Sequence, residues 1–306
     1  MTSQPPPANA VYKPPNSNPV PEGIAAAPDG NLWFTERGGN NVGRITVTGT
    51  VTEFAIPSSG SAPSGIAAGS DGNVWFTEDD VNKIGRVTPA GTVTEYSVPT
   101  FQGLDYAGNS ITAGPDGAIW FTEGQANKIG RLGTGFTEYA LPSGAQPEAY
   151  AGSNGIAAGP DGALWFTEYP NTIGRITTSG TVTQFTTPTA NSYPAGIAVG
   201  PDGALWFAEA NANNIARIST SGTITEFAVP TPNAEPMSIA LGPDGALWFT
   251  ERYADKIGRI TTSGVLTEYP ITLSPYGYPT GLAVGPDDAL WWADDGNQII
   301  GRQLTH

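Results

Sequence analysis

The sequence predicts an all-β protein: a single seven-bladed β-propeller of four-stranded blades, closed by an N-terminal strand that completes the last blade. The main observation is a segment of the form Pro-Asp-Gly-Ala-Leu-Trp-Phe-Thr-Glu that recurs seven times along the 306 residues. Its tryptophans are spaced by 41 to 45 residues, a period typical of propeller blades. No stretch shows the sustained 3.6-residue apolar period of a helix. The tryptophans are Trp33, Trp75, Trp120, Trp165, Trp206, Trp248 and Trp291.

Each repeat divides into four short strands separated by turn residues. One unit reads GIAVGPDGALWFAEANANNIARISTSGTITEFAVP. We assign GIAVG to strand A, ALWFAE to strand B, NIARIS to strand C and TITEFAVP to strand D. Pro-Asp-Gly separates A from B, and Thr-Ser-Gly separates C from D, as expected of turns. The small residues of strand A suit the crowded ring axis, and we expect each Trp of strand B to fill the gap to the next blade.

The last repeat, residues 281–306, stops after its strand C. The segment AVYKPP at 10–15 resembles the strand D endings EFAVP and EYSVP, so we expect it to supply the missing outer strand. Closing the ring in this way removes open sheet edges. Residues 1–9 are then a Pro-rich tail, and residues 10–306 form the propeller.

Composition excludes several classes of function. The chain is acidic, with a net charge of −15 and only 13 Lys and Arg, which argues against binding to nucleic acid or to an anionic membrane surface. There is no Cys, and no apolar run approaches the roughly 20 residues of a membrane span. The N-terminus lacks the layout of a signal peptide. We expect a protein that is cytoplasmic, or secreted with its signal removed.

Histidine chemistry is nearly absent from the sequence. The single His is His306, at the C-terminus. Unless that tail folds back, this excludes a Ser-His-Asp triad and an HExxH zinc site. No phosphate-binding or dinucleotide-binding fingerprint is present.

Every repeat carries one acid and one Arg at fixed places. The acid ends strand B, at Glu36, Glu78, Glu123, Glu168, Glu209, Glu251 and Asp294. The Arg lies in strand C, at Arg44, Arg86, Arg131, Arg175, Arg217, Arg259 and Arg302. A ring of carboxylates for a metal or a cationic ligand is one interpretation. We favour mutual pairing across each B–C hairpin, because the numbers are equal and unpaired buried charge is costly.

The repeats differ in their D–A and B–C connections, which lie on one side of an up-and-down blade. Variable loops on a rigid scaffold are where sites are usually built, so we expect a polar and aromatic funnel there. Its partner would be a small molecule, a glycan or a peptide. The alternative is that these Tyr and Asn residues only cap loops in solvent. The candidate ligand-binding residues are Glu22, Tyr106, Asn109, Tyr150, Asn154, Met237, Tyr278 and Thr280.

Carboxylates are the remaining candidates for catalysis. Glu22, Glu148, Glu235 and the Asp294–Asp295 pair offer ligands for Ca²⁺ or Mg²⁺, or a general base if one is buried. None has a diagnostic spacing, so no metal site is predicted. Asp295 and Glu235 are the catalytic candidates.

The motifs Leu/Val-Trp-Phe-Thr-Glu and Lys-Ile-Gly-Arg, which recur across nearly the whole chain, are similar to the repeat of the streptogramin B lyase (virginiamycin B lyase) family. The resemblance implies a seven-bladed propeller. It also implies enzymes that linearise a cyclic depsipeptide antibiotic by Mg²⁺-assisted elimination at an ester C–O bond. Mg²⁺ is a cofactor for this chain only by that resemblance.

The resemblance also indicates where the catalytic residues belong. It places one His before strand A of the sixth blade and another before strand A of the seventh, where this chain has Met237 and Thr280. Tyr278 stands at a Glu position, Asp295 is nearest to a second Glu, and Glu22 replaces an aromatic residue. Met cannot accept a proton, and Thr is a very weak base. The chain thus has the repeat motifs of the family but lacks the two His residues that the resemblance implies as catalytic.

We therefore expect a virginiamycin B lyase-like propeller that binds a ligand in its loop funnel and lacks the His-dependent C–O lyase activity. Whether the protein is an enzyme is left open. A second hypothesis is a metal-assisted lyase or hydrolase that uses carboxylates. A third is a structural or cell-surface interaction scaffold that uses the outer blade edges.

Overall fold

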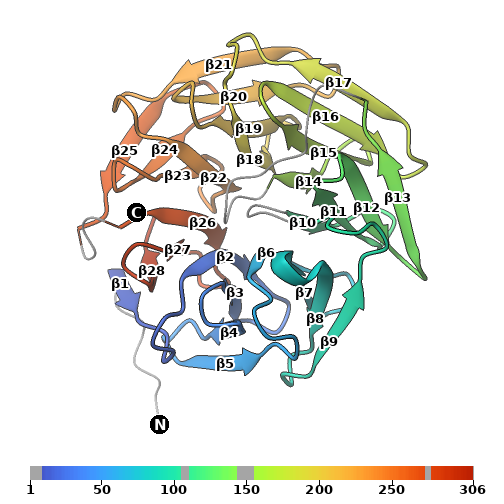
Figure 1. The fold of residues 1–306 in the computed structure, drawn as a ribbon. Coiled ribbons are helices and arrows are strands. Elements are labelled where there is room, and N and C mark those ends of the chain that lie inside the picture. Colours follow the sequence, from blue (N-terminus) through green and yellow to red (C-terminus); the bar gives the residue numbers. More distant parts are fainter. Residues whose placement is uncertain (1–8, 105–109, 143–154, 273–276, 306) are drawn as a thin grey trace.

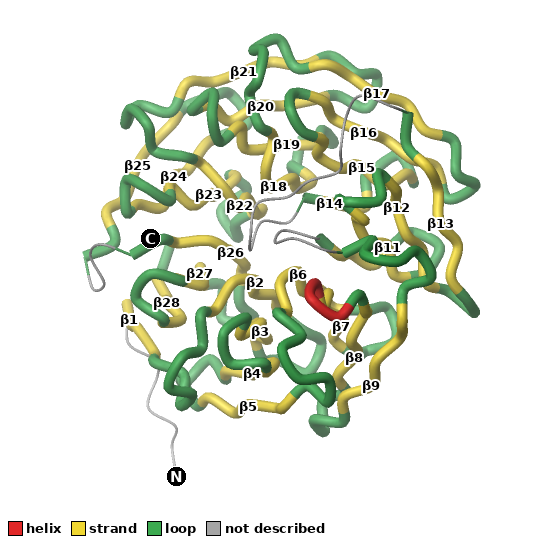
Figure 2. The backbone as a smooth tube through the Cα atoms, in the orientation of Figure 1, coloured by secondary structure: helices red, strands yellow, loops and turns green. Residues whose placement is uncertain are grey.

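The computed structural model describes residues 9–104, 110–142, 155–272 and 277–305. In this part of the chain, 28 strands form seven antiparallel sheets of four strands each. The sheets are arranged as blades around a central axis (Figures 1 and 2). The predicted all-β, seven-bladed fold is confirmed.

Each of the first three blades follows the chain from its inner strand to its outer strand. Blade 1 contains β2 (Pro21–Ala26), β3 (Leu32–Glu36), β4 (Asn41–Ile45) and β5 (Val51–Ala55). Blade 2 contains β6 (Pro63–Ala68), β7 (Val74–Glu78), β8 (Lys83–Val87) and β9 (Val93–Ser97), with the 3₁₀ turn η1 (Asp79–Val81) after β7. Blade 3 contains β10 (Ile111–Ala113), β11 (Ile119–Glu123), β12 (Lys128–Leu132) and β13 (Phe136–Ala140).

Blades 4 to 6 repeat the same order. Blade 4 contains β14 (Ile156–Ala158), β15 (Ala163–Glu168), β16 (Thr172–Thr177) and β17 (Val182–Thr186). Blade 5 contains β18 (Pro194–Val199), β19 (Leu205–Glu209), β20 (Asn214–Ile218) and β21 (Ile224–Ala228). Blade 6 contains β22 (Pro236–Leu241), β23 (Leu247–Glu251), β24 (Lys256–Ile260) and β25 (Leu266–Pro270).

Blade 7 is built from both ends of the chain. It contains β26 (Pro279–Val284), β27 (Leu290–Asp294) and β28 (Ile299–Gln303), and its outer strand is β1 (Asn9–Tyr12). The closing strand thus occupies Asn9–Tyr12, a shorter and slightly earlier segment than the expected 10–15. The Tyr12 ring stacks on Trp291 with ring centroids 5.6 Å apart. In the other six blades a strand D aromatic stacks on the Trp in the same way, so the two chain ends rebuild a normal blade.

The core is divided into seven clusters, one at each junction between blades. Each cluster joins the strand B Trp of one blade to strand A and strand B residues of the next. At the junction of blades 1 and 2, Trp33 packs with Ile66 and Phe76. At the closing junction, Trp291 packs with Ile24 and Phe34. The expected role of the Trp, to fill the gap to the next blade, is confirmed.

The repeated Arg residues pair with a different acid from the one expected. In every blade the Trp indole N–H donates to the Asp of the A–B turn, at 2.9–3.1 Å. This turn is Pro-Asp-Gly in five blades, Ser-Asp-Gly in blade 2 and Pro-Asp-Asp in blade 7. In five blades the strand C Arg donates its Nε–H to that same Asp, at 2.6–2.8 Å. The predicted pairing of strand B Glu with strand C Arg is therefore wrong. Trp and Arg are cross-strand neighbours, whereas the Glu three residues after the Trp points to the opposite face of the strand.

The strand B glutamates are buried, and in five blades they lie near an acid of strand D instead. Glu78 lies above the Cα of Gly85, where a Cβ would come within 2.7 Å of its Oε1 atom. Gly85 is paired with Glu95 of strand D. Burial, together with the neighbouring Glu95 carboxylate, raises the pKa of Glu78 to about 8. Burial also raises the pKa of the corresponding strand B acids to about 7 or 8, at Glu36, Glu123, Glu168, Glu209 and Glu251.

No helix in the described part of the chain is long and apolar enough to cross a membrane.

We expect thermal stability to fall as the pH rises from about 5 to about 8. A carboxyl group whose pKa is higher in the folded state than in the unfolded state favours the fold while it is protonated there. This contribution is fully present below the unfolded pKa of about 4.3 and is lost as the pH passes the folded pKa of 7 to 8. Melting temperatures measured across this range test the trend.

The variant Glu78→Gln sharpens that test, because it removes one titrating group and keeps the shape. Blade 4 already contains a Glu168–Gln184 pair, in which the Gln184 amide donates to both carboxylate oxygens. We expect a flatter pH profile in Glu78→Gln and an unchanged profile in the exposed control Asp80→Asn. Identical profiles in wild type and Glu78→Gln would contradict the prediction.

Candidate functional site

The D–A and B–C connections meet on one face of the ring, here called the loop face. The residue that follows strand B donates its backbone N–H to the carbonyl of the residue that precedes strand A of the same blade. These bonds join Arg37 to Val20, Ala210 to Tyr193, Arg252 to Glu235 and Asp295 to Tyr278, at 3.0–3.3 Å. The two variable loops of a blade therefore present their side chains together, as expected.

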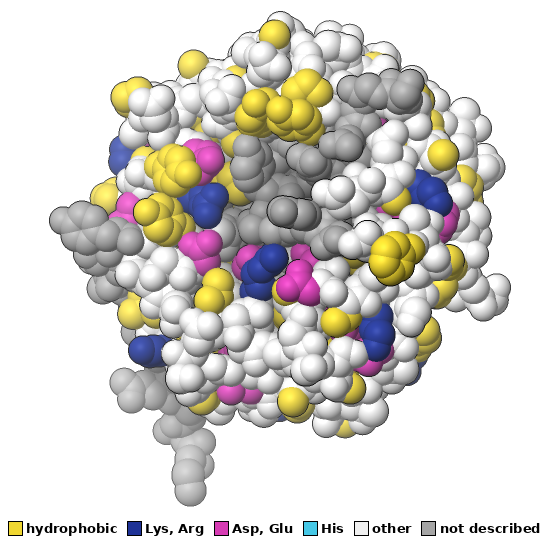
Figure 3. Space-filling view, in the orientation of Figure 1, with side chains coloured by type: hydrophobic (Ala, Val, Ile, Leu, Met, Phe, Trp, Pro, Cys, Tyr) yellow, Lys and Arg dark blue, Asp and Glu magenta, His cyan; other side chains and the backbone are white. Residues whose placement is uncertain are grey.

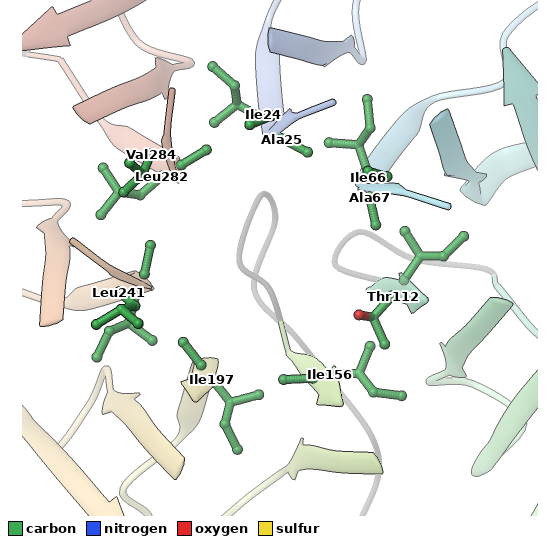
Figure 4. Close-up of a pocket in the computed structure, with 18 of the residues that line it drawn as sticks. Ile24, Ala25, Ile66, Ala67, Thr112, Ile156, Ile197, Leu241, Leu282 and Val284 are labelled. Atoms are coloured by element: carbon green, nitrogen blue, oxygen red, sulfur yellow. The ribbon is translucent and has the colours of Figure 1, made fainter. Parts of the chain in front are cut away.

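Charged and hydrophobic side chains lie around the centre of the loop face (Figure 3). Below the loop face, strand A side chains line an axial cavity of about 430 Å³. Ile24, Ile66, Ile197, Leu241 and Val284 are among the labelled side chains around this cavity (Figure 4). Thr112 is the one polar side chain among its described lining residues, so the axial cavity is almost entirely apolar there.

Met237 is a core residue. Its side chain has no exposed surface and belongs to the cluster between blades 5 and 6, together with Trp206 and Phe249. A thioether in this environment packs and carries no proton-transfer chemistry.

Thr280 is also buried, and its hydroxyl has a structural role. Its Oγ1 lies 3.1 Å from the Glu22 carbonyl oxygen and 3.3 Å from that of Ala293. At other junctions a strand B Thr of the preceding blade makes the equivalent bond, as Thr35 does to the Ser64 carbonyl at 2.7 Å. Blade 7 has Ala293 at that strand B position, so Thr280 supplies the hydroxyl that the blade lacks.

Two Arg-centred groups span four consecutive blades and are here called the charged ribbon. In the first, Arg37 Nη1 lies 3.5 Å from Glu22 and 3.8 Å from Asp79. In the second, Arg252 lies 3.7 Å from Glu235 and 3.6 Å from Asp295. Each Arg follows strand B of its blade, and each is held between an acid of its own blade and an acid of the next.

Burial perturbs the acids of the charged ribbon. It raises the pKa of Glu22 to about 8, against the lowering effect of Arg37 and with further raising from Asp79 and Asp295. Burial also raises the pKa of Glu235 and of Asp295, against the lowering effect of Arg252 on both. Because Asp295 acts on Glu22, the two groups are electrostatically linked across the junction of blades 7 and 1. The Glu22 Oε2 atom has no hydrogen-bond partner among the described residues.

The described residues do not fit the Mg²⁺ that the family resemblance implies. Among them, no three acidic or His side chains lie close enough together to hold a metal ion. Asp295 and Glu235 both face the Arg252 guanidinium, and its positive charge opposes a divalent cation at that point. Asp294 is fully buried and accepts backbone N–H bonds from Tyr278 and Asn297.

The loop face also has two tyrosine pairs, one beside the charged ribbon and one between blades 4 and 5. Tyr278, which is 43% exposed, meets Tyr253 edge to face at 5.9 Å, and the Arg252 guanidinium lies over both rings. Tyr169 and Tyr193 form the second pair, with ring centroids 4.8 Å apart. The space-filling view shows hydrophobic side chains, in yellow, in groups around the centre of this face (Figure 3).

The structure thus brings together only some of the predicted site residues. Glu22, Glu235, Asp295 and Tyr278 lie on or beside the charged ribbon, whereas Met237 and Thr280 are in the core. The other candidates fall outside the described residues: Tyr106, Asn109, Glu148, Tyr150 and Asn154.

The sequence places Arg37 and Arg252 directly after strand B, in the expected funnel, but neither was among the ligand-binding candidates, and Tyr253 was missed entirely. The signal was the dipeptide Arg-Tyr directly after strand B of blade 6. The corresponding dipeptide is Gly124-Gln125 in blade 3 and Ala210-Asn211 in blade 5.

Comparison with known proteins gives consistent matches. A family model described as the virginiamycin B lyase family matches residues 7–151 and 105–306. The structure of virginiamycin B lyase from Staphylococcus aureus is 42% identical over 96% of this chain and 98% of that chain, with a TM-score of 0.87. A catalytically inactive variant of that enzyme, with one His replaced by Ala and with quinupristin present, matches equally well. A streptogramin B lyase structure is 36% identical over 96% of both chains, with a TM-score of 0.86. A search of curated proteins gave no match.

We expect Thr280→Val to lower the free energy of unfolding by about 1–2 kcal/mol, because it leaves the buried Glu22 carbonyl without its hydroxyl donor. Thr280→Ser keeps the hydroxyl and should recover part of that loss. Urea unfolding measures both, with the exposed Thr225→Val as the matched control. If Thr280→Val is as stable as wild type, the structural role assigned to this hydroxyl is wrong.

Proposed function

The chain belongs to the virginiamycin B lyase family, and we propose that it binds a small ligand on its loop face without catalysing the family's His-dependent elimination. The observation that carries this proposal is the pair Met237 and Thr280. Both stand where the family resemblance places catalytic histidines, and both are fully buried.

The relatives support the loss of elimination. Replacing one His by Ala accompanies catalytic inactivity in the S. aureus enzyme. This chain has neither of the two implied histidines, and its single His is the terminal His306. The two replacements also have structural roles of their own, Met237 in the core and Thr280 as a hydroxyl donor to the Glu22 carbonyl.

The chemistry of the loop face supports ligand binding. The side chains of Arg37 and Arg252 remain 26% and 23% exposed, so each can donate further hydrogen bonds. The Asp295 side chain is 19% exposed and offers an acceptor, whereas the Glu22 Oε2 and Asp295 Oδ1 atoms are buried. Exposed tyrosine rings lie beside them. A surface with donors, acceptors and apolar ring faces suits a small polar molecule that also has apolar faces.

Quinupristin is the direct probe for the missing elimination. We expect the purified protein, supplied with Mg²⁺, to give no ring-opened quinupristin by mass spectrometry under conditions in which the S. aureus enzyme consumes it. The physical reason is the absence of a general base of suitable pKa at positions 237 and 280. Ring opening by the wild-type protein would overturn this part of the proposal.

Binding is tested separately by thermal shift with neutral oligosaccharides, short peptides and quinupristin. We expect at least one class to raise the melting temperature, because ligands that bind only the folded state stabilise it. The gain should disappear in Arg252→Met and persist in Arg44→Met, whose Arg donates to the Pro89 carbonyl outside the charged ribbon. If no class stabilises the wild type, the binding proposal fails.

A second candidate function is catalysis by a carboxylate base. Burial raises the pKa of Asp295 and Glu235, which moves both toward the range useful for proton transfer near neutral pH. In the same quinupristin assay, turnover that is lost in Asp295→Asn would favour this candidate. Turnover unaffected by Asp295→Asn and by Glu235→Gln would exclude it.

A further inference from the structure

We propose that a pocket between blades 5 and 6 of the loop face binds one uncharged sugar ring, such as the terminal residue of an oligosaccharide. The inference rests on the proposed binding function and names its ligand class. The pocket has a volume of about 200 Å³, and its walls include Tyr193, Ala210, Asn211, Asn233, Glu235 and Tyr253. This is below the range of roughly 300–1,000 Å³ for drug-sized ligands, so the pocket suits a single ring.

The pocket exists because blade 5 has a small residue where its neighbours have large ones. Ala210 occupies the position after strand B that is Arg252 in blade 6 and Tyr169 in blade 4. Its side chain is buried and leaves room in front of Glu235 of the next blade. The space that an Arg fills in the charged ribbon is therefore open at this junction.

Two tyrosines provide apolar surfaces for the ring. Tyr253 is 61% exposed, so much of its ring surface is free to contact a ligand. Its backbone N–H is bonded to the Ala234 carbonyl, and that of Tyr193 to the Pro170 carbonyl, so both residues are fixed in place. A sugar has apolar C–H faces that pack on aromatic rings, and its hydroxyls remain at the rim.

Polar groups for those hydroxyls are present in the same pocket. The Asn211 amide N–H donates to the Asn191 carbonyl, which leaves its amide oxygen as an acceptor. Asn233 is exposed, and no side-chain hydrogen bond to it occurs among the described residues. The Glu235 side chain is 17% exposed at the pocket wall, whereas its Oε2 atom is buried and lies 3.7 Å from Arg252 Nη1. Hydroxyl groups can donate and accept, so they match this mixed set.

The charges favour a neutral ligand over an organic cation or anion. An aromatic ring and a carboxylate, such as Tyr253 and Glu235, can together bind a cation. Here the bound cation is the Arg252 guanidinium, which lies 5.8 Å from the Tyr253 ring centroid and 3.7 Å from the Glu235 carboxylate. A second cation would meet the repulsion of Arg252, and an anion would meet that of Glu235.

Saturation-transfer NMR and calorimetric titration with cellobiose, maltose and chitobiose test the proposal. We expect at least one of these disaccharides to bind saturably. Tyr253→Ala should weaken that binding by about tenfold or more, because it removes one face of the pocket. Tyr253→Phe keeps the ring and should stay within about threefold of wild type. Phe101→Ala removes another exposed aromatic residue, from the loop that precedes blade 3, and should leave binding unchanged.

The outcomes separate this inference from the proposed function. If no disaccharide binds while peptides or quinupristin stabilise the protein, the sugar assignment is wrong and the binding function stands. If nothing binds, both fail. Binding that survives Tyr253→Ala and Tyr193→Ala places the sugar elsewhere and overturns the inference. Tighter binding of glucosamine than of glucose, lost in Glu235→Gln, would identify a cation site and overturn it as well.

Discussion

The structure depends on the packing of one tryptophan per blade against the next blade. A four-stranded blade cannot bury both of its faces alone, and the strand B Trp covers the inner strands of its neighbour at all seven junctions. The indole is held by an Asp of the Pro-Asp-Gly turn and by a strand D aromatic ring. Fully burying one large aromatic side chain contributes about 3 kcal/mol, so seven such contacts are a major part of the driving force for folding. Tyr12, near the N-terminus, stacks on Trp291 and so provides the strand D aromatic ring of the closing blade.

Because the Trp junctions stabilise the ring, the residues of the loop face can differ from blade to blade. The turns that hold the Trp lie at the opposite end of the strands, so changes in the D–A and B–C loops do not disturb the junctions. Thr280 shows how the two roles interact. It occupies a position where the family resemblance implies a catalytic His, yet here it replaces a hydroxyl that blade 7 lost at Ala293. In this chain the position therefore has a structural role.

The sequence was sufficient for the fold, because the period of the Trp motif and the missing last strand depend only on residue order. It was not sufficient for the charges. Pairing of strand B Glu with strand C Arg looked reasonable by number, but the alternation of side chains along a strand puts Trp and Arg on one face and Glu on the other. Composition cannot distinguish those two arrangements.

The site was harder to predict, because it depends on an unusual backbone conformation. The residue before the strand A Pro has a positive φ at Val20, Ala62, Tyr193 and Glu235, between 44° and 53°. Residues before Pro normally adopt extended conformations, so nothing in the sequence indicated this geometry. Together with the small Ala210, it brings Tyr193 and Glu235 into a shared pocket. Equivalent positions in different blades thus present different side chains to one surface.

Hydrogen-exchange mass spectrometry with and without saturating cellobiose tests most directly whether the variable loops, and not the repeated parts, bind the ligand. The account predicts slower amide exchange in the loops around 190–194, 210–213 and 233–235 and at 252–253. It predicts no change in the Pro-Asp-Gly turns or in the outer strands. Slower exchange in those turns, or along the strands that line the axial cavity, without any change in the loops would contradict it.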